Sequence, residues 1–322
     1  MWQQLLAHDG PLLMKFGIIA VALLLAWLLP LPQRFNPLFW LAELAGRMAT
    51  KVCRPNRSAR QQKLAGMMAL LLLVLPFWII ALLLLELAAY PSFFELAILY
   101  CCMHDLHARR DLSNCGRALL VADKTTARNL LGQWVQRDTN ILSEAGIAKT
   151  AIELAVTSAA YGSIAVVLFF WIGGVPLVLL ALMLKTLEQR WSPSNPRYRD
   201  FSRGVTLVNH WLFWLPTQAC RLSLAIQGGP QALAQLVRLK AFAISERGYL
   251  QICQLAATVL AVELGGARKY QGERIAVTKV GPPRLPHNGD ISRALSLANT
   301  SRWFWLGFSL ILPALWVLLR LR

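Results

Sequence analysis

The sequence predicts an all-α integral membrane protein: a single bundle of about four to six membrane-embedded helices, with cytoplasmic amphipathic helices and polar loops. Three observations support this fold class. Hydrophobic residues make up 56% of the 322 residues and charged residues only 15%, whereas soluble domains carry about 25% charged residues. Long apolar runs recur along the chain, the clearest at residues 67–85. The basic side chains lie mainly between those runs.

The first apolar segments predict an anchor helix and a transmembrane helix. Residues 11–29 lack the basic n-region and the Ala-x-Ala-like site of a signal peptide, so we expect a retained helix. Residues 67–90 contain the uncharged run, and Pro76 within it predicts a kink that neighbouring helices can accommodate. Residues 92–103 are apolar but contain Glu95. They predict either a third crossing or a buried interfacial helix.

The middle of the chain contains an interrupted apolar segment at residues 160–186. Its two halves are separated by Gly173-Gly174 and Pro176. Each half is too short to cross about 30 Å at about 1.5 Å per residue, so the segment predicts either a broken span or a re-entrant hairpin. The candidate spans are residues 11–29, 67–90, 92–103, 160–186, 205–226 and 303–319. The polar segments assigned to the cytoplasmic side are residues 33–63, 104–150, 187–204 and 265–302.

The net charge of +17, from 33 Lys and Arg against 16 Asp and Glu, permits two interpretations. A nucleic-acid-binding protein gathers basic side chains on a soluble face. A membrane protein instead collects them in short cytoplasmic loops, where they contact anionic lipid headgroups. Because the basic segments are bounded by apolar runs, we expect membrane lipids and no nucleic acid as partners. The predicted location is the bacterial inner membrane, with several passes.

Several short strings, none of them specific alone, follow one another along nearly the whole chain. They are Arg137-Asp138-Thr139, Ile152-Glu153, Leu264-Gly265-Gly266, Gly272-Glu273-Arg274 and Asp290-Ile291-Ser292-Arg293. In this order, the chain resembles the CobD/CbiB family of membrane proteins. The resemblance implies an adenosylcobinamide-phosphate synthase, which joins aminopropanol or its phosphate to adenosylcobyric acid through an amide bond. It also implies Mg²⁺ and ATP as cofactors and a corrinoid as substrate.

The resemblance assigns roles to two groups of residues. Those implied for catalysis are Arg137, Asp138 and Glu153, and those implied for ligand binding are Thr139, Tyr270, Gly272, Glu273 and Arg274. Arg137 offers a fork that suits phosphate, and Asp138 is the best metal-ligand candidate. A structural alternative stands beside each role. Arg137 and Asp138 could belong to a salt-bridged helix cap, and Glu153 could pair with Lys149 one helical turn away.

The sequence departs from the family pattern at five strings. A family Glu-Asn, Asp-Gly, Asn-Thr-Leu-Asp, Asp-Asp and Pro-Asn are matched here by Thr157-Ser158, Tyr161-Gly162, Lys185-Thr186-Leu187-Glu188, Asn209-His210 and Arg247-Gly248. Carboxylates hold the Mg²⁺ that neutralises nucleotide phosphates. Replacing them, and adding a lysine, predicts that the family reaction is weakened or absent.

Three hypotheses follow. The first is a ligase-type enzyme of cobalamin assembly, and the second is a non-catalytic membrane sensor or regulator, as a more distant similarity to AmpE implies. The third is a small transporter, for which the interrupted segment near Gly173-Gly174 would form the site. The absence of an internal repeat disfavours the transporter. The retained strings favour the first hypothesis as ancestry, and the lost acids favour the second as present activity.

Overall fold

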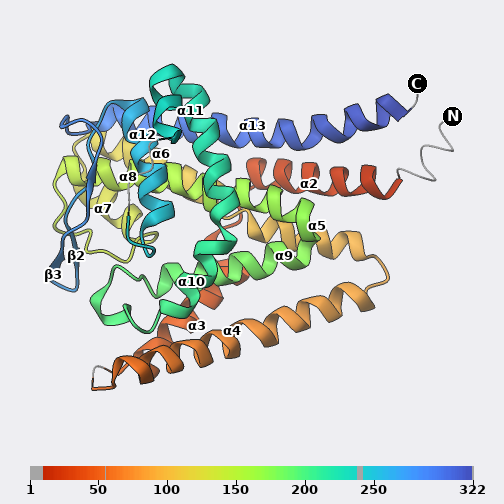
Figure 1. Cartoon of the computed structure of the whole chain (residues 1–322), viewed down its shortest axis with the longest axis horizontal. Coiled ribbons are helices and arrows are strands. Elements are labelled where there is room, and N and C mark those ends of the chain that lie inside the picture. The colour runs from red at the N-terminus through yellow and green to blue at the C-terminus, as the bar shows by residue number, and fades with distance from the viewer. Residues whose placement is uncertain (1–9, 55, 238–241, 321–322) are drawn as a thin grey trace.

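The computed structural model describes residues 10–54, 56–237 and 242–320. Helices dominate it, and α2, α4 and α13 run along the long axis (Figure 1). The start of α2 and the end of α13 lie at one end of the molecule, and the β2–β3 hairpin lies at the other. The first half comprises α2 (Gly10–Leu28), η1 (Gln33–Phe35), α3 (Pro37–Val52), α4 (Ala59–Leu87), α5 (Pro91–Cys102), α6 (Asp105–Leu120) and α7 (Lys124–Gly132).

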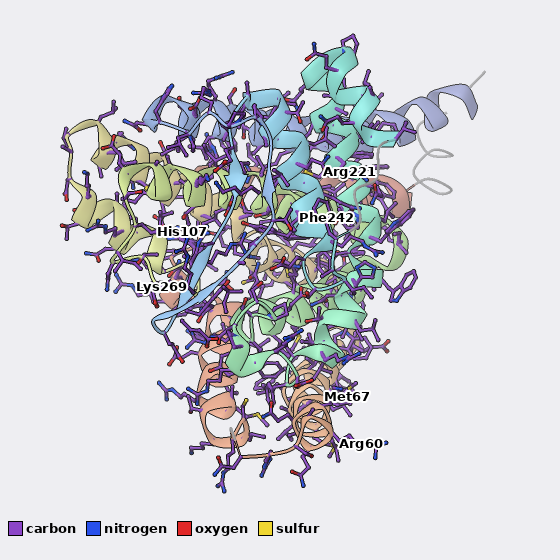
Figure 2. All side chains as sticks on the ribbon, turned by 60° about the vertical axis from the view of Figure 1, so that its left-hand side comes forward. Arg60, Met67, His107, Arg221, Phe242 and Lys269 are labelled. Atoms are coloured by element: carbon purple, nitrogen blue, oxygen red, sulfur yellow. The ribbon has the colours of Figure 1, made fainter. Side chains whose placement is uncertain are left out.

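Short local signals set where these helices begin. The Asn36 side chain accepts a hydrogen bond from the Leu38 N–H, with proline at the first position of α3, where its missing N–H costs nothing. Ser58 and Gln61 form a capping box at the start of α4. Arg60 lies in the first turn of α4, and the apolar run begins at Met67, further along the same helix (Figure 2).

Two described helical stretches are long and apolar enough to cross a membrane by length and composition, Ala59–Leu87 and Glu144–Arg190. In the first, α4, only 22% of the apolar window is buried. Leu72 and Ile80 remain 63% and 53% exposed. A large exposed apolar face is typical of a membrane-spanning helix or of a helix at a protein interface. The count of four to six embedded segments and the inner-membrane location stay predictions.

The second stretch contains α8 (Glu144–Ala159), η2 (Ala160–Ile164) and α9 (Ala165–Arg190), and it does not run straight. Gly174 adopts φ +65° and ψ −163°, a conformation that side-chain-bearing residues avoid. The chain folds back there, because the Lys185 ammonium lies 3.6 Å from the centre of the Tyr161 ring. Residues 160–186 therefore fold back on themselves, and whether they cross a membrane or re-enter it stays a prediction.

The predicted span at residues 205–226 is divided in the structure. After η3 (Pro196–Tyr198), α10 (Arg203–Leu212) is followed by its C-cap residue, Phe213. The next helix, α11 (Trp214–Val237), begins directly after Phe213. The α11 segment folds back in turn at Gly229, whose φ is +71°. As a result, Arg221 Nη2 donates to the Leu236 carbonyl at 3.2 Å. A Gly-Gly pair before proline marks both fold-backs, Gly173-Gly174 with Pro176 and Gly228-Gly229 with Pro230.

The C-terminal part differs from the all-α prediction. After α12 (Arg247–Leu260), four short strands form two antiparallel pairs, β1 (Leu264–Gly265) with β4 (Lys279–Val280) and β2 (Arg268–Tyr270) with β3 (Glu273–Ile275). Gly272 and Gly281 have positive φ, which permits the tight turns between strands. The final helix, α13 (Asn288–Arg320), extends the predicted span 303–319 back through residues predicted to be a polar segment.

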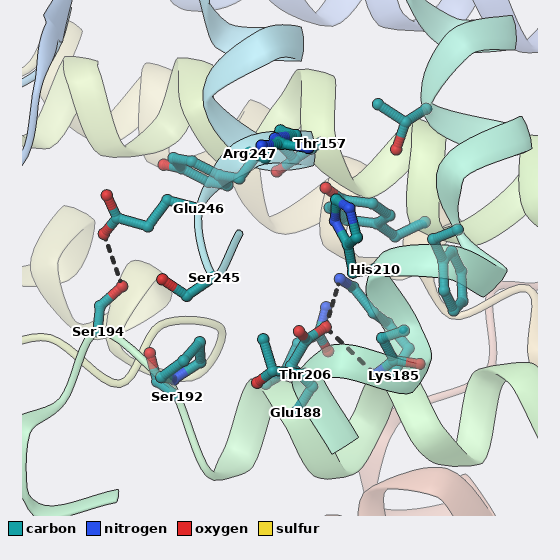
Figure 3. A pocket seen from close by; sticks show the side chains of 18 of the residues that line it. Thr157, Lys185, Glu188, Ser192, Ser194, Thr206, His210, Ser245, Glu246 and Arg247 are labelled. Carbon is teal, nitrogen blue, oxygen red and sulfur yellow. Dashed lines mark hydrogen bonds and ion pairs between the residues drawn. The ribbon is translucent and has the colours of Figure 1, made fainter. Parts of the chain in front are cut away.

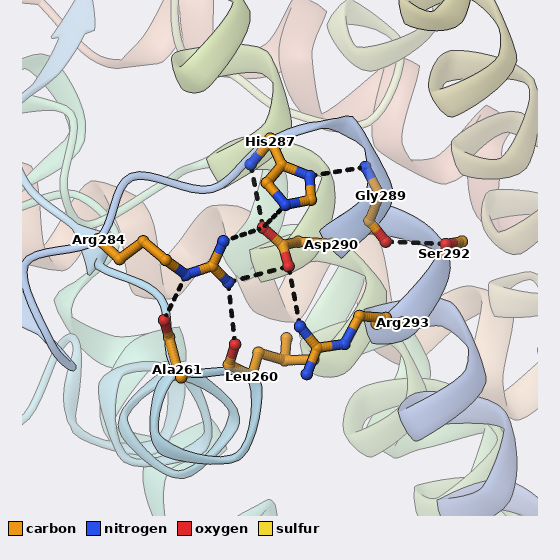
Figure 4. Close-up of polar contacts among 8 residues, drawn as sticks. All are labelled: Leu260, Ala261, Arg284, His287, Gly289, Asp290, Ser292 and Arg293. Atoms are coloured by element: carbon orange, nitrogen blue, oxygen red, sulfur yellow. Dashed lines mark hydrogen bonds and ion pairs between the residues drawn. The ribbon is translucent and has the colours of Figure 1, made fainter.

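A buried carboxylate anchors the start of α13. Asp290 is fully buried, and Arg284 Nη1 and Nη2 donate to its two oxygens at 3.0 Å each (Figure 4). Arg293 Nη1 adds a bond of 3.1 Å. Arg284 Nε donates to the Ala261 carbonyl at 2.8 Å, and Nη2 also donates to the Leu260 carbonyl at 3.1 Å. This cluster ties the end of α12 to α13, which packs along the buried helix α8.

Candidate functional site

A cavity of about 490 Å³ opens where α8, α9, α10, α11, α12 and β2 meet (Figure 3). Its wall is mixed: apolar rings such as Phe213 and Trp214 lie beside the polar side chains of Ser194 and Thr206. The fold-back at Gly174 creates it, because that turn brings the far half of α9 beside η2. The volume lies within the usual range for small-molecule sites.

The five strings at which the resemblance implies departures from the CobD/CbiB pattern all contribute to this wall. The residues concerned are Thr157, Tyr161, Lys185, Glu188, Asn209, His210, Arg247 and Gly248. They come from four helices and the intervening η2 segment, and they span residues 157–248. The departures are therefore concentrated in one place in space, although they are scattered in sequence.

Lys185 fills the floor of the cavity with a positive charge. Its Nζ lies 2.7 Å from Glu188 Oε2 and 5.2 Å from the centre of the Phe213 ring, in addition to its contact with Tyr161. Asn209 Nδ2 donates to the same Glu188 oxygen at 3.2 Å and to the Leu184 carbonyl at 2.9 Å. An ammonium against a carboxylate and two ring faces is held both by charge and by cation–π attraction.

Glu153, on α8, lies fully buried behind the cavity wall. Its Oε2 accepts hydrogen bonds from Arg137 Nη2 at 2.8 Å and from the Tyr249 hydroxyl at 2.5 Å. Its Oε1 accepts from the Gly265 N–H at 2.7 Å. Arg268 Nη2 lies 3.5 Å from Oε2. Since both oxygens are engaged, Glu153 joins four segments of the chain.

The structural alternative for Glu153, a pair with Lys149, is wrong. Lys149 Nζ instead lies 2.5 Å from Glu263 Oε1, and Lys279 approaches the other oxygen of Glu263 at 3.2 Å. The hydrogen bond from Lys149 holds the pKa of Glu263 below its usual value. Helical spacing allowed the Lys149–Glu153 contact, but partners from outside α8 are closer to both residues.

Of the remaining residues implied for catalysis and binding, some line the cavity and others lie outside it. Arg137 and Tyr270 line the cavity. Asp138 does not: its oxygens accept from the Gln271 N–H at 3.1 Å and the Gly272 N–H at 2.9 Å. Its own N–H donates to the Lys269 carbonyl at 2.8 Å. Asp138 thus caps the β2–β3 turn.

Four further residues lie outside the cavity wall. Thr139 is buried beside Gly132. Gly272 forms the hairpin turn with φ +86°. Glu273 and Arg274 are exposed on β3. Sequence reasoning missed Tyr249 and Arg268, which line the cavity and contact Glu153; the only available signal for Arg268 was its place just after the Leu264-Gly265-Gly266 string.

The cavity wall does not offer the set of free carboxylates that the implied Mg²⁺ would need. The carboxylates in its wall are Glu188, which is paired with Lys185, and Glu246, which accepts from the Ser194 hydroxyl at 3.0 Å. Among the described residues, no three His, Cys, Asp or Glu side chains gather as a metal site would require. Hard cations take several oxygen ligands, and here one of the two carboxylates is already paired with an ammonium.

Comparisons with known proteins identify the same family as the short strings in the sequence do. The sequence profile described as "CobD/Cbib protein" matches residues 19–298. The cobalamin biosynthesis protein CobD of Chromobacterium violaceum is 28% identical over 295 residues, covering 91% of this chain and 95% of the relative. CobD of Stutzerimonas stutzeri is 28% identical over 285 residues, covering 88% and 93%.

A relative named CbiB also matches. The cobalamin biosynthesis protein CbiB of Salmonella choleraesuis is 25% identical over 321 residues, covering 92% of this chain and 96% of the relative. No solved structure matches significantly. A profile match over most of the chain, with relatives aligned nearly end to end, shows that this chain belongs to the CobD/CbiB family of membrane proteins.

Proposed function

We propose that this chain is a CobD/CbiB-family membrane protein that binds a corrinoid-type ligand but does not form the amide bond with Mg²⁺ and ATP. The observation that carries the proposal is the Lys185–Glu188 ion pair on the cavity floor, 2.7 Å between Nζ and Oε2. An ammonium at this place both occupies the carboxylate and repels a divalent cation.

The remaining wall suits recognition of a polar, anionic ligand. Arg137, Arg247 and Arg268 line it, and guanidinium groups bind carboxylate and phosphate through two parallel hydrogen bonds. Corrinoid intermediates carry carboxylate, amide or phosphate groups at their periphery. A cavity of about 490 Å³ is sized for such a peripheral arm, with the macrocycle remaining outside.

The test combines binding with turnover in the same samples. Detergent-purified protein would be titrated with adenosylcobyric acid and with adenosylcobinamide phosphate, and Mg-ATP-dependent amide formation with aminopropanol would be assayed in parallel. The Chromobacterium violaceum relative would be carried through the same assays for comparison. The proposal expects binding without ATP consumption or amide product.

Two results would overturn it. Turnover comparable with that of the relative would mean an active synthase with a rearranged metal site. No binding of either corrinoid would contradict a corrinoid ligand and would favour a membrane sensor or regulator of another signal.

A further inference from the structure

Arg268, the first residue of β2, is buried without its full set of hydrogen bonds. Its side chain is only 9% exposed. Its Nε and Nη2 are fully shielded and donate a hydrogen bond to no residue that the structure describes. The Nη2–Glu153 contact of 3.5 Å lacks hydrogen-bond geometry. Buried polar groups almost always have partners, because an unpaired one is costly.

Glu153 does not supply what Arg268 lacks. The carboxylate already accepts from Arg137, from Tyr249 and from the backbone of β1. Three donors account for most of its acceptor capacity. One carboxylate thus faces two guanidinium groups, which leaves a net positive charge on this side of the cavity.

The position of Arg268 is fixed by a ring. Its Cζ lies 4.6 Å from the centre of the Tyr249 ring, and Tyr249 belongs to the first turn of α12. The guanidinium is therefore held at the N-terminal end of a 14-residue helix. Stacking on the aromatic face holds the plane of the guanidinium but provides no acceptor for its Nε–H and Nη2–H groups.

The N-terminal end of α12 adds two further positive contributions, the charge of Arg247 and the unpaired backbone N–H groups of the first turn. Arg247 is the first residue of α12, lines the cavity and is half-buried; in the part of the chain described, no carboxylate pairs with it. The N-cap residue, Glu246, makes no side-chain capping bond. Backbone N–H groups at a helix start and the helix dipole both favour an anion.

We propose that Arg268, Arg247 and the first turn of α12 form a subsite for an oxyanion, the phosphate or carboxylate group of the cavity ligand. The identity of that ligand rests on the proposed function, whereas the ability of the subsite to bind an oxyanion does not. Arg268 would donate from a plane fixed by the Tyr249 ring, and Arg247 would donate from the first position of α12.

Inorganic phosphate is the probe for this subsite. The full-length protein in detergent, free of phospholipid, would be titrated calorimetrically at about 0.15 M salt, where exposed charges are largely screened. Arg268→Lys keeps the charge but loses the fork, and Arg247→Gln removes a half-buried cation with little expected effect on folding. Each variant should raise the Kd for phosphate on the order of tenfold.

Lys269→Gln is the matched control, because Lys269 lies in the same hairpin, is exposed and does not line the cavity. It should leave the Kd unchanged. Absence of phosphate binding would overturn the subsite. So would unchanged binding in both Arg268→Lys and Arg247→Gln, or an equal loss in Lys269→Gln, which would indicate diffuse surface charge.

A lipid headgroup could present the same oxyanion. Phosphate titrations in nanodiscs with and without phosphatidic acid separate the two sources. Weaker phosphate binding in the nanodiscs that contain phosphatidic acid assigns the subsite to a lipid headgroup. Equal binding in both kinds of nanodisc assigns it to a soluble ligand. Failure here is distinguishable from failure of the proposed function. Phosphate binding that depends on Arg268, without corrinoid binding, supports the subsite and contradicts the corrinoid ligand. Corrinoid binding that is insensitive to Arg268→Lys supports the corrinoid ligand and contradicts the subsite.

Discussion

Lys185 and Glu188 form an ion pair inside the cavity of this CobD/CbiB-family chain, with 2.7 Å between Nζ and Oε2 and side chains 14% and 11% exposed. Both residues belong to the string that the resemblance matches to a family Asn-Thr-Leu-Asp, in which Lys185 stands at the position of the asparagine. Its burial makes it consequential both for stability and for what the cavity can bind.

Lys185→Met should destabilise the protein by about 2 kcal/mol, because Glu188 would remain buried with only Asn209 as a donor. Thermal unfolding in detergent would measure the loss. Adding Glu188→Gln to Lys185→Met should recover part of it, since the uncompensated charge is then gone. Equal melting temperatures for wild type and Lys185→Met would show that the pair does not form.

Restoring the family acids should create affinity for Mg²⁺. The variant Thr157→Glu with Tyr161→Asp and Lys185→Asn places carboxylates on the cavity wall and releases Glu188. We expect Mg²⁺ to raise its melting temperature through preferential binding to the folded state, and wild type to show no such increase.

A control for that experiment needs the same charge change elsewhere. Thr125→Glu, Gln271→Asp and Arg274→Gln together lower the net charge by three at exposed positions. This control should gain no Mg²⁺-dependent stabilisation. If the control gains as much as the restored variant, general charge would explain the effect, and the cavity would not be the metal site of the restored protein.

Glu153→Gln should cost about 3 kcal/mol, because two guanidinium groups and a tyrosine hydroxyl lose their common anion. Glu273→Gln, at an exposed position on β3, should change stability by less than about 0.5 kcal/mol. Melting curves of the two variants would be compared with wild type. An unchanged Glu153→Gln protein would mean that the carboxylate is a functional group rather than a structural one.

Asp290 should contribute stability that is lost in acid. Burial alone would raise its pKa, but the hydrogen bonds from Arg284 and from the His287 N–H, together with the charge of Arg284, lower it below its usual value. A carboxylate with a lowered pKa in the folded state stabilises above its unfolded pKa of about 3.9, and the contribution disappears as the pH falls through the folded pKa.

The measurement is the melting temperature of wild type and Asp290→Asn between about pH 7 and pH 3. The variant should be less stable at neutral pH, and the difference should shrink as the pH falls below about 4. A constant difference across this range would mean that ionisation of Asp290 is not linked to folding.

Gly174→Ala should destabilise the α9 fold-back by about 1–3 kcal/mol, because its φ of +65° with ψ −163° is open almost only to glycine. Gly17, within α2, has no neighbour within 4 Å of an added Cβ and no positive φ. Gly17→Ala should therefore be neutral or slightly stabilising. Similar melting temperatures for both variants would contradict the turn at Gly174.

Several features of this protein were determined by the sequence itself, because they depend on neighbouring residues. The run at residues 67–85 forms a helix of crossing length, and Asn36-Pro37 begins α3. The Gly173-Gly174 pair with Pro176 marked a break that the structure turns into a fold-back. Family membership also followed from sequence, because the order of short strings needs no three-dimensional contact.

Only the tertiary structure decided which side chains meet. Glu153 binds Arg137 and Arg268, which are 16 residues before it and 115 residues after it in the chain, while Lys149 four residues away binds Glu263. Asp138, the favoured metal ligand, caps a hairpin turn. Helical spacing states which contacts are allowed, but a buried charge takes the partner that best replaces water, and that partner comes from elements far away in sequence.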